Sequence, residues 1–339
     1  MSSKEVTIYD IAKHLDIAAS TVSRGLKGHY TVSKKTQKKI RMAADSMGYR
    51  SNTFAANLRK QRTGTVGVII PRLNSFFMAE VIAGIEKVTS EAGLNLIISQ
   101  SLEDVEKEIK NVRTMFDNRV DGLLVSLSEN STNTSHFDML VEKGIPLIFF
   151  DRIPSDKDFP SVMIDNEEAG YLITRHLISQ GCKRIVHITS NKLNNVYKYR
   201  YNGYLRALNE AGLEYKRDML ITGNLNEDAG IQAAESIVKL KADAVFAAND
   251  NCAASCMNEL KRMGVNIPND VAIAGFNNDM ISRNVDPALT TINYPGFKMG
   301  EIVASNLVDQ LEDKSNINVT SNITIKAELK IRSSSRRIL

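Results

Sequence analysis

The sequence predicts a small all-α head that contains a helix-turn-helix, followed by a larger α/β body with two lobes. Three observations lead to this fold class. Residues 1–62 carry 13 Lys and Arg against 4 Asp and Glu, a net charge of +9, whereas the other 277 residues carry 30 against 35, a net charge of −5. Short helical patterns fill the head, and apolar runs that alternate with helical segments fill the body. At 339 residues, the chain is also too long for one ordinary core.

Composition and cysteine usage are typical of a globular protein from a reducing compartment. Hydrophobic residues make up 43% of the chain and charged residues 24%. The cysteines, Cys182, Cys252 and Cys256, are too few for a disulfide framework and lack histidines at ligand spacing, so we expect buried thiols rather than a metal site. No signal-peptide core and no apolar run of about 18 residues occur. We therefore expect a cytoplasmic protein with no cofactor and no membrane contact.

Three short helices separated by brief turns are predicted in the head. Thr7 and Asp10 have the spacing of a capping box, which starts the first helix. Ser33 is a favoured N-cap for the third helix, and Gly48 is a favoured terminator. The spacing of the apolar residues places the helices at residues 8–15, 18–26 and 34–47.

The second of these helices presents a polar ridge that suits the major groove of DNA. Arg24 can donate two hydrogen bonds to a guanine, which is worth roughly 1–3 kcal/mol of discrimination. Ser20 can bond several bases, and Ala19 can contact a thymine methyl group. Val22 and Leu26 fall on the opposite side, toward the core. The outward face comprises Ala19, Ser20, Ser23, Arg24 and Lys27.

The third helix adds a cluster of positive charge. Two interpretations remain open for it: phosphate contacts, which give salt-dependent affinity without sequence information, or a solvated face. The uneven charge of the chain favours a polyanionic partner for the head. The cluster consists of Lys34, Lys35, Lys38, Lys39 and Arg41.

The run VTIYDIAKHLDIAASTVSRGLKGHYTVSKKTQKKIRMAADSMGYRSN resembles the headpiece of the lactose/galactose repressor (LacI/GalR) family. The blocks TVSR, YDIA and GY stand at the family's spacings, and the resemblance continues to about residue 331. It implies a DNA-binding transcriptional regulator, a repressor, that binds a pseudo-palindromic operator as a homodimer. The DNA-binding positions expected from the ridge and the resemblance are Thr7, Tyr9, Ala19, Ser20, Thr21, Ser23, Arg24, Lys27, Ser33, Thr36, Tyr49, Asn52, Ala55 and Leu58.

Four positions depart from the family pattern. Asp16 replaces the glycine of the turn, and Ala18 replaces the serine that caps the recognition helix, a loss of about 1 kcal/mol. Gly25 stands where a larger core residue is usual, at a cost in helix propensity of about 1 kcal/mol. Ser51 replaces a proline. We therefore expect a headpiece of marginal stability.

Residues 51–63 form the predicted hinge. A helix over residues 53–60 is too short to persist alone in water, so a flexible linker is expected off DNA. In the resembled family this segment folds on the operator, where two copies pair in the minor groove and a leucine wedge enters a central base step. Leu58 occupies that position, with Ala55 and Asn57 nearby. Because pyrimidine–purine steps open most easily, a central CG step is expected.

The body alternates nearly continuous apolar strands with helices such as residues 81–92 and 201–211, which indicates parallel sheets with helices on both faces. At least two such series fit, so we expect two lobes and a cleft at the carboxyl ends of their strands. The predicted strands span residues 65–70, 94–99, 121–126, 146–150, 184–189, 244–248 and 271–276.

The body also resembles the type I periplasmic-binding-protein fold, through the runs DGLLVS, FFDR, NGYLRAL, FAAND, IPNDVAIAGFNN and PALTTI. The resemblance implies a small-molecule effector between the lobes. It also implies the following division: headpiece 1–50, hinge 51–63, first lobe 64–163 plus 293–322, second lobe 164–292 plus 323–331, and a basic tail 332–339.

Candidate effector contacts follow the strand ends or match family positions. Arg200 matches the family's ligand-binding arginine, and Leu225 matches a position that is often aromatic. Asn277 stands where the family usually has an aspartate that binds hydroxyls. Polar groups around an aromatic wall suit a hydroxylated ring, so we expect a sugar or sugar derivative. The full set is Phe77, Met78, Asp151, Arg200, Leu225, Asn249 and Asn277.

Some of these positions have a simpler interpretation. Phe77 is also explained by helix packing, and Asp250 is explained equally well as a helix cap or as a ligand contact. The loss of a carboxylate at Asn277 weakens the case for a neutral hexose and leaves room for an acidic or modified sugar.

The sequence disfavours two other classes of function, an enzyme and a transport-type binding protein. An enzyme is disfavoured because the sequence has no G-x-S-x-G elbow, no P-loop and no G-x-G-x-x-G after the first strand of the body. A transport-type sugar-binding protein is disfavoured by the basic head and the missing signal peptide. The end of the chain, IRSSSRRIL, has no heptads, so a coiled-coil tetramer is not expected.

Overall fold

The computed structural model describes residues 6–49, 62–190, 194–312 and 321–337. The chain divides into two compact units, Met1–Gln61 and Arg62–Leu339, which are described separately. The predicted hinge helix at residues 53–60 and the positions Asn52, Ala55 and Leu58 lie outside the described residues.

The first unit contains the three predicted helices, α1 (Ile8–Leu15), α2 (Ala19–Leu26) and α3 (Lys34–Ser46). The Asp10 carboxylate accepts hydrogen bonds from the backbone amide and the hydroxyl of Thr7, at 2.8 and 2.7 Å, so these two residues bond at the predicted helix start. The helices enclose a small core that includes Ile11, Val22 and Ile40. The three predicted helices are confirmed, with α2 beginning one residue later than expected.

Two of the unusual positions in this unit have a structural explanation. Asp16 adopts a left-handed backbone conformation, with φ of 52°, which explains why a glycine is usual there. Gly25 is buried, and a Cβ atom at that position would lie 2.4 Å from Cδ1 of Ile40. The space of the expected larger side chain is therefore filled by Ile40.

Ala18 is the N-cap of α2 and has the extended backbone of a capping residue but no side-chain hydrogen bond. Ser33, by contrast, accepts a hydrogen bond from the Thr36 amide at 3.2 Å at the start of α3. Ala18→Ser should therefore stabilise the headpiece by about 1 kcal/mol. Hydrogen exchange of the α2 amides in the full chain measures this gain, and Ser33→Ala should produce a loss of similar size in α3. Unchanged protection of α2 in Ala18→Ser would contradict the missing-cap explanation.

The first lobe of the second unit is built on a six-stranded sheet with the order β11-β5-β4-β3-β1-β2. Every neighbouring pair in it is parallel. Its strands are β1 (Thr65–Ile70), β2 (Asn95–Gln100), β3 (Gly122–Val125), β4 (Leu147–Phe150), β5 (Ser161–Ile164) and β11 (Asn322–Ile325).

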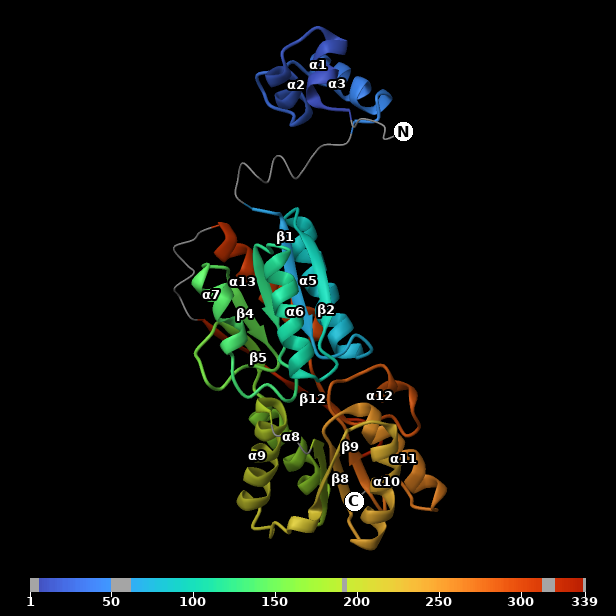
Figure 1. The fold of residues 1–339 in the computed structure, drawn as a ribbon. Helices are drawn as coiled ribbons and strands as arrows, with labels where there is room; N and C mark the ends of the chain where they lie inside the picture. Colours follow the sequence, from blue (N-terminus) through green and yellow to red (C-terminus); the bar gives the residue numbers. More distant parts are fainter. Residues whose placement is uncertain (1–5, 50–61, 191–193, 313–320, 338–339) are drawn as a thin grey trace. The chain divides into compact units, whose positions relative to one another are not determined.

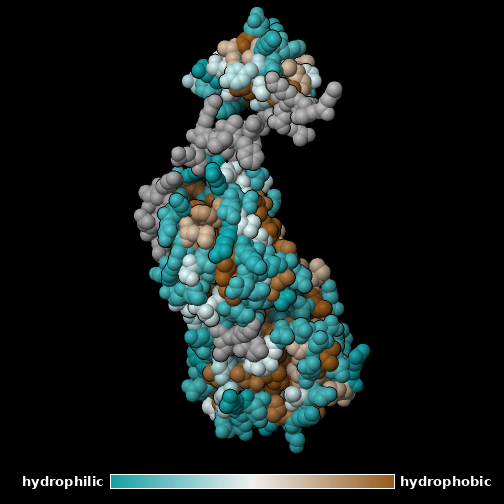
Figure 2. All heavy atoms as spheres, in the orientation of Figure 1, coloured by the Kyte–Doolittle hydropathy of each residue, from teal (hydrophilic) through white to brown (hydrophobic). Residues whose placement is uncertain are grey.

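Helices cover both faces of this sheet (Figure 1). Val68 and Ile70 of β1 face α5 (Phe76–Glu91) and α13 (Gly296–Glu312), whereas Ile69 faces α6 (Val105–Asp117). The short helices η1 (Ser135–Phe137) and α7 (Asp138–Glu142) complete the second layer. Hydrophilic side chains predominate on the face of this lobe seen in Figure 2, as expected for helices whose apolar sides are buried.

The second lobe has a four-stranded parallel sheet with the order β7-β6-β8-β9. One face packs against α8 (Asn166–Ser179) and α9 (Asn195–Glu210), and the other against α10 (Glu227–Lys239) and α11 (Asp250–Arg262) (Figure 1). The remaining elements are β6 (Ile185–Ser190), β7 (Leu220–Gly223), β8 (Ala244–Ala247), β9 (Ala272–Ala274), η2 (Arg217–Met219) and α12 (Ile281–Asn284).

A short antiparallel pair, β10 (Thr291–Asn293) and β12 (Glu328–Lys330), joins the two lobes (Figure 1). The chain thus passes between the lobes three times, after β5, after β10 and after β11. The prediction that residues 323–331 return to the second lobe is wrong for β11, which pairs with β5 of the first sheet.

The last described residues are an integral part of the second lobe rather than a basic tail. Ser334 and Ser335 are buried, and the Ser334 carbonyl accepts a hydrogen bond from the Ile273 amide of β9 at 2.8 Å. Arg337 donates to the carbonyl of Asp243 at 2.7 Å. The expected tail at residues 332–339 therefore packs along β9 in its described part, because the small serines fit between β9 and the segment at Thr290.

Helix pairs in both lobes pack unusually closely through glycines. A Cβ atom at Gly300 of α13 would lie 2.0 Å from the Val81 carbonyl oxygen of α5. A Cβ atom at Gly203 of α9 would lie 2.0 Å from the Glu167 carbonyl oxygen of α8. No side chain fits at either position unless the backbones separate.

All three cysteines are buried and free, so the expected buried thiols are confirmed. Burial raises the pKa of Cys252 to about 12 and that of Cys182 to about 11, which leaves both as unreactive thiols at neutral pH. Within the described ranges, no helix combines the length and the apolar character that a bilayer crossing requires.

His187 of β6 is fully buried in an aromatic stack, 4.4 Å from Phe246 between ring centroids. Its Nδ1 donates a hydrogen bond to the Phe246 carbonyl oxygen at 2.9 Å. Burial, helped by the nearby charge of Arg200, lowers the pKa of His187 to about 4. The imidazole is therefore neutral in the folded protein.

This histidine predicts a loss of stability in mild acid. Below about pH 6.5 the unfolded chain binds a proton at this residue and the folded chain does not, so the contribution of His187 to the unfolding free energy falls by about 2 kcal/mol between pH 7 and pH 5. Urea unfolding of the wild type and of His187→Gln at the two pH values isolates this contribution, because the variant should lose about 2 kcal/mol less than the wild type between pH 7 and pH 5. Equal losses in the two proteins would contradict the assignment.

Candidate functional site

Helix α2, the predicted recognition helix, presents its predicted polar face to solvent. Ser20, Arg24 and Lys27 are exposed, whereas Ala19, Thr21 and Ser23 are half-buried on the flanks. The side chain of Arg24 forms no hydrogen bond or ion pair with another described residue, so its guanidinium is available for an external acceptor. Of the remaining predicted positions, Thr7, Tyr9 and Ser33 are exposed, and Thr36 and Tyr49 are half-buried.

The basic cluster of α3 is exposed in full. None of its five side chains is paired with an acidic group in the described part of the head, where Asp10, the acidic residue of α1, bonds to Thr7. Phosphate groups would therefore not have to displace an existing partner, which suits the cluster to salt-dependent contact with a duplex.

A cavity of about 560 Å³ opens between the two lobes of the body. The structure brings all seven predicted effector positions together around it, although they come from both lobes and are spread over 201 positions of the sequence. They are Phe77, Met78, Asp151, Arg200, Leu225, Asn249 and Asn277.

Arg200 is held rigidly at the floor of this cavity. It is 3% exposed; its Nε donates to Asn166 Oδ1 at 2.9 Å and its Nη1 to the Ala248 carbonyl at 2.8 Å. The guanidinium carbon lies 3.5 Å from the ring centroid of Phe276. Nη2 has no hydrogen-bond partner among the residues that the structure describes, so it can donate to a ligand. Burial lowers the pKa of Arg200, which still remains charged at neutral pH.

Phe77 and Asp151 meet at Tyr294, a residue that was not among the predicted positions. The Tyr294 hydroxyl donates to Asp151 Oδ1 at 2.5 Å, and its ring stacks on Phe77 with 4.2 Å between centroids. Phe77 thus packs in the core and also forms part of the cavity wall. Burial raises the pKa values of both Asp151 and Tyr294.

Most charges around the cavity are paired. Arg152 donates to Glu103 at 2.6 Å, and Arg72 lies 3.7 Å from the same carboxylate. The Ser190 hydroxyl donates to Glu129. The cavity is lined by three arginines and four carboxylates in all, so it carries no excess of positive charge.

The second-lobe wall contains two of the predicted amides, Asn249 and Asn277. Asn249 caps α11 by accepting from the Cys252 amide at 2.7 Å, and its Nδ2 donates to the Leu225 carbonyl at 2.9 Å. Asn277 adopts φ of 109°, and its Nδ2 lies 3.5 Å from Asp279 Oδ2. Both residues line the cavity, although Asn249 already uses both ends of its amide.

Asp250 has neither of the two roles considered for it. It is fully buried and does not line the cavity, and the residue that caps α11 is Asn249. Its carboxylate accepts hydrogen bonds from the Asp279 amide at 2.8 Å and from the Thr291 hydroxyl at 2.7 Å. Asp250 therefore supports the segment that carries Asn277 and Asp279.

Asn195 makes two hydrogen bonds that connect the lobes, in addition to the bond from Ser190 to Glu129. Asn195, at the start of α9, donates from Nδ2 to the Asp151 carbonyl at 3.0 Å and accepts from the Ile153 amide at 3.2 Å. Asp151 and Ile153 belong to the first lobe, so this amide bridges the two lobes.

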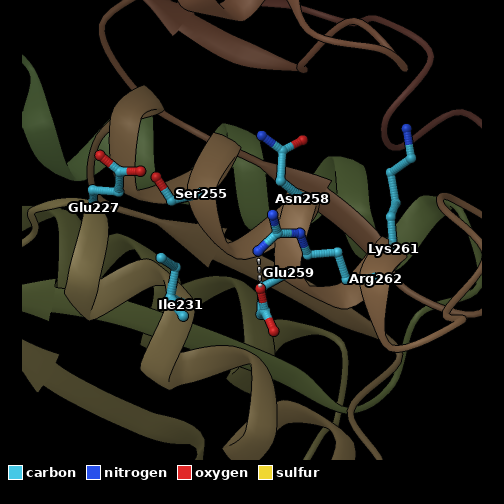
Figure 3. A pocket seen from close by; sticks show the side chains of 7 residues that line it. All are labelled: Glu227, Ile231, Ser255, Asn258, Glu259, Lys261 and Arg262. Atoms are coloured by element: carbon cyan, nitrogen blue, oxygen red, sulfur yellow. Dashed lines mark hydrogen bonds and ion pairs between the residues drawn. The ribbon is translucent and has the colours of Figure 1, made fainter.

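A second hollow lies on the outer surface of α10 and α11, away from these residues (Figure 3). It includes the 3.5 Å ion pair of Arg262 with Glu259 and contains none of the predicted positions. It is lined by Glu227, Ile231, Ser255, Asn258, Glu259, Lys261 and Arg262.

A three-helix head with an exposed recognition helix, together with a two-lobed body that encloses a polar cavity, defines the class of ligand-responsive DNA-binding regulators. Residues 7–52 match the model of the lacI family of bacterial regulatory proteins, and residues 174–335 match a periplasmic binding protein-like domain. Catabolite control protein A of Priestia megaterium is 32% identical over 336 residues, which cover 98% of this chain and 99% of that protein. The chain therefore belongs to the LacI family.

Two further relatives agree with this assignment. The HTH-type transcriptional repressor PurR of Vibrio atlanticus (strain LGP32) is 30% identical over 311 residues, covering 91% of this chain and 92% of that protein. The solved transcriptional regulator CelR in complex with cellobiose has a TM-score of 0.73 and 26% identity, covering 97% of this chain and all of the other. This protein is accordingly a LacI-type DNA-binding transcriptional regulator and not an enzyme.

Proposed function

We propose that this protein represses transcription by binding a pseudo-palindromic operator as a homodimer, and that a sugar or sugar derivative in the interlobe cleft changes its operator affinity. The observation that carries the proposal is the convergence of the seven predicted effector positions on one cavity. Because its targets are on DNA, we infer that the protein acts in the cytoplasm.

The lining of the cavity supports a sugar. Phe77, Tyr197 and Tyr294 contribute aromatic side chains to the lining, and six asparagines contribute amides. A sugar ring combines apolar C–H faces with hydroxyls that donate and accept, so it matches such a lining. The complex of the related CelR with cellobiose is consistent with this class of effector.

The contacts between the lobes support a coupling of effector binding to DNA binding. An effector that contacts both lobes competes with, or adds to, the bridge that Asn195 makes to Asp151 and Ile153. Only a difference in affinity between two arrangements of the lobes transmits a signal, and 1–3 kcal/mol of such coupling changes operator affinity roughly 5–150-fold. We infer that the hinge at residues 51–63 conveys the change, with Leu58 as the minor-groove wedge.

Selection of duplexes from a random library by the full-length protein tests the DNA part of the proposal. We expect an enriched palindrome with a central CG step. A thermal-shift panel of sugars and sugar acids, followed by titration of the selected duplex with and without each hit, tests the effector part. Failure to enrich any sequence over random duplex would refute operator recognition, and a panel without effect on operator affinity would refute the sugar effector.

A further inference from the structure

Asp279 is the one carboxylate at the cavity wall that accepts no hydrogen bond shorter than 3.5 Å from the described residues. It follows β9, lines the cavity and is 5% exposed. Its Oδ1 is buried and has no partner in the described part of the chain, and its Oδ2 lies 3.5 Å from Asn277 Nδ2, at the limit for a hydrogen bond.

The backbone of Asp279 is, in contrast, firmly held. Its amide donates to Asp250 Oδ2 at 2.8 Å, and its carbonyl accepts from the amide and the hydroxyl of Ser282 at 2.9 and 2.7 Å. Asp250 is itself fixed by the Thr291 hydroxyl. The scaffold therefore holds the Asp279 carboxylate in place without satisfying it.

A buried acceptor without a donor lowers the stability of the folded chain. Burial also raises the pKa of Asp279 to about 6, so the group is mostly ionised at neutral pH and its need for donors is greatest there. A residue that is kept at such a cost in a ligand-sized cavity is typical of a binding site, where function and stability compete.

The neighbouring charges determine which ligands suit this carboxylate. Arg152 and Arg72 are paired with Glu103, and Asp151 is bonded to Tyr294. The groups left for a ligand include the Nη2 of Arg200, the Asp279 carboxylate and the asparagine amides other than that of Asn249, which is already paired at both ends. An anionic ligand would meet the negative charge of Asp279, whereas a neutral one with hydroxyl donors would satisfy it.

We propose that Asp279 is the carboxylate that binds effector hydroxyls in this protein, in place of the aspartate expected at position 277, and that the effector is a neutral, hydroxyl-rich sugar rather than a sugar acid. This inference rests on the proposed sugar-responsive function. It reverses the expectation drawn from Asn277, because the carboxylate is displaced by two residues rather than lost.

The first experiment needs no ligand. Asp279→Asn keeps the shape of the side chain and removes the buried charge, so the full-length variant should unfold about 2 to 4 °C higher than the wild type at pH 7.5. Asp250→Asn is the matched control, and it should unfold at a lower temperature because Asp250 accepts two short hydrogen bonds. A lower unfolding temperature for Asp279→Asn would make Asp279 a structural residue and overturn the inference.

The second experiment measures binding of D-glucose, D-ribose, cellobiose, D-gluconate and D-glucuronate by calorimetry. We expect a neutral sugar to bind the wild type and Asp279→Asn to bind it at least 10-fold more weakly. Binding of a sugar acid alone would overturn this inference and leave the sugar-responsive function intact. Absence of any binding would overturn both.

Discussion

Arg24→Ala is expected to abolish the preference of the protein for its selected operator while leaving weak, salt-dependent binding to any duplex. Arg24 is exposed on α2 and has no partner among the described residues of the head. Each lost bidentate contact to guanine costs roughly 1–3 kcal/mol, so the two half-sites bound by a dimer together lose about 2 to 6 kcal/mol. Fluorescence anisotropy with the selected duplex and a scrambled duplex measures this loss.

Lys38→Ala provides the matched control for Arg24. Lys38 is exposed on α3, in the basic cluster, and we expect it to contact phosphate rather than bases. Its loss should weaken binding to both duplexes by the same factor and reduce the dependence of log K on log salt by about 1 for each contact. Normal discrimination by Arg24→Ala would show that α2 does not read the bases.

Arg200→Ala is expected to remove the effector response while leaving operator binding in place. The substitution deletes the Nη2 donor at the cavity and leaves Asn166 and Ala248 without the hydrogen bonds that Arg200 now donates. We expect the affinity for an effector sugar to fall by about 100-fold or more, the effect of losing a charge-assisted hydrogen bond together with the packing around it. Calorimetry and operator titration with the sugar measure the two effects.

Arg206→Ala is the control for this variant, because Arg206 lies on the same helix α9 but points to the surface. It pairs with Glu167 and Glu168 and stacks on Tyr171, with 3.9 Å from its guanidinium carbon to the ring centroid. Surface pairs of this kind contribute about 0–1 kcal/mol, so effector binding should be unchanged. Wild-type affinity in Arg200→Ala would exclude Arg200 from the effector site.

The helices and strands that are determined by residues close together in the sequence could be predicted. Capping residues and helical spacing define α1–α3, and apolar runs mark the buried strands β1, β3, β4, β6 and β8. The position of β11 could not be predicted, because the alternating run NITI fits the edge of either sheet. The start of α5 at Phe76 rather than Val81 depends on the cap that Ser75 provides.

The candidate site was predictable where the residues follow strand ends or match a family position, as for Asp151 and Arg200. Tyr294 was missed because its partner Asp151 lies 143 positions away, and only the crossing of the chain between the lobes brings the two together. Asp279 was missed because no local pattern distinguishes an unsatisfied carboxylate from a solvated one. Whether the Asp279 carboxylate finds hydrogen-bond donors depends on how Asp250 and Asn277 pack around it.

The glycine contacts at Gly300 and Gly203 determine where this molecule can deform. Backbones that touch without intervening side chains cannot slide or tilt against each other, so the α5–α13 and α8–α9 pairs make each lobe mechanically stiff. Any rearrangement caused by an effector is then concentrated in the three connecting segments that run between the lobes. These segments act as the hinge about which the two rigid lobes rotate. A small rotation about these segments displaces most the parts of each lobe that lie farthest from them.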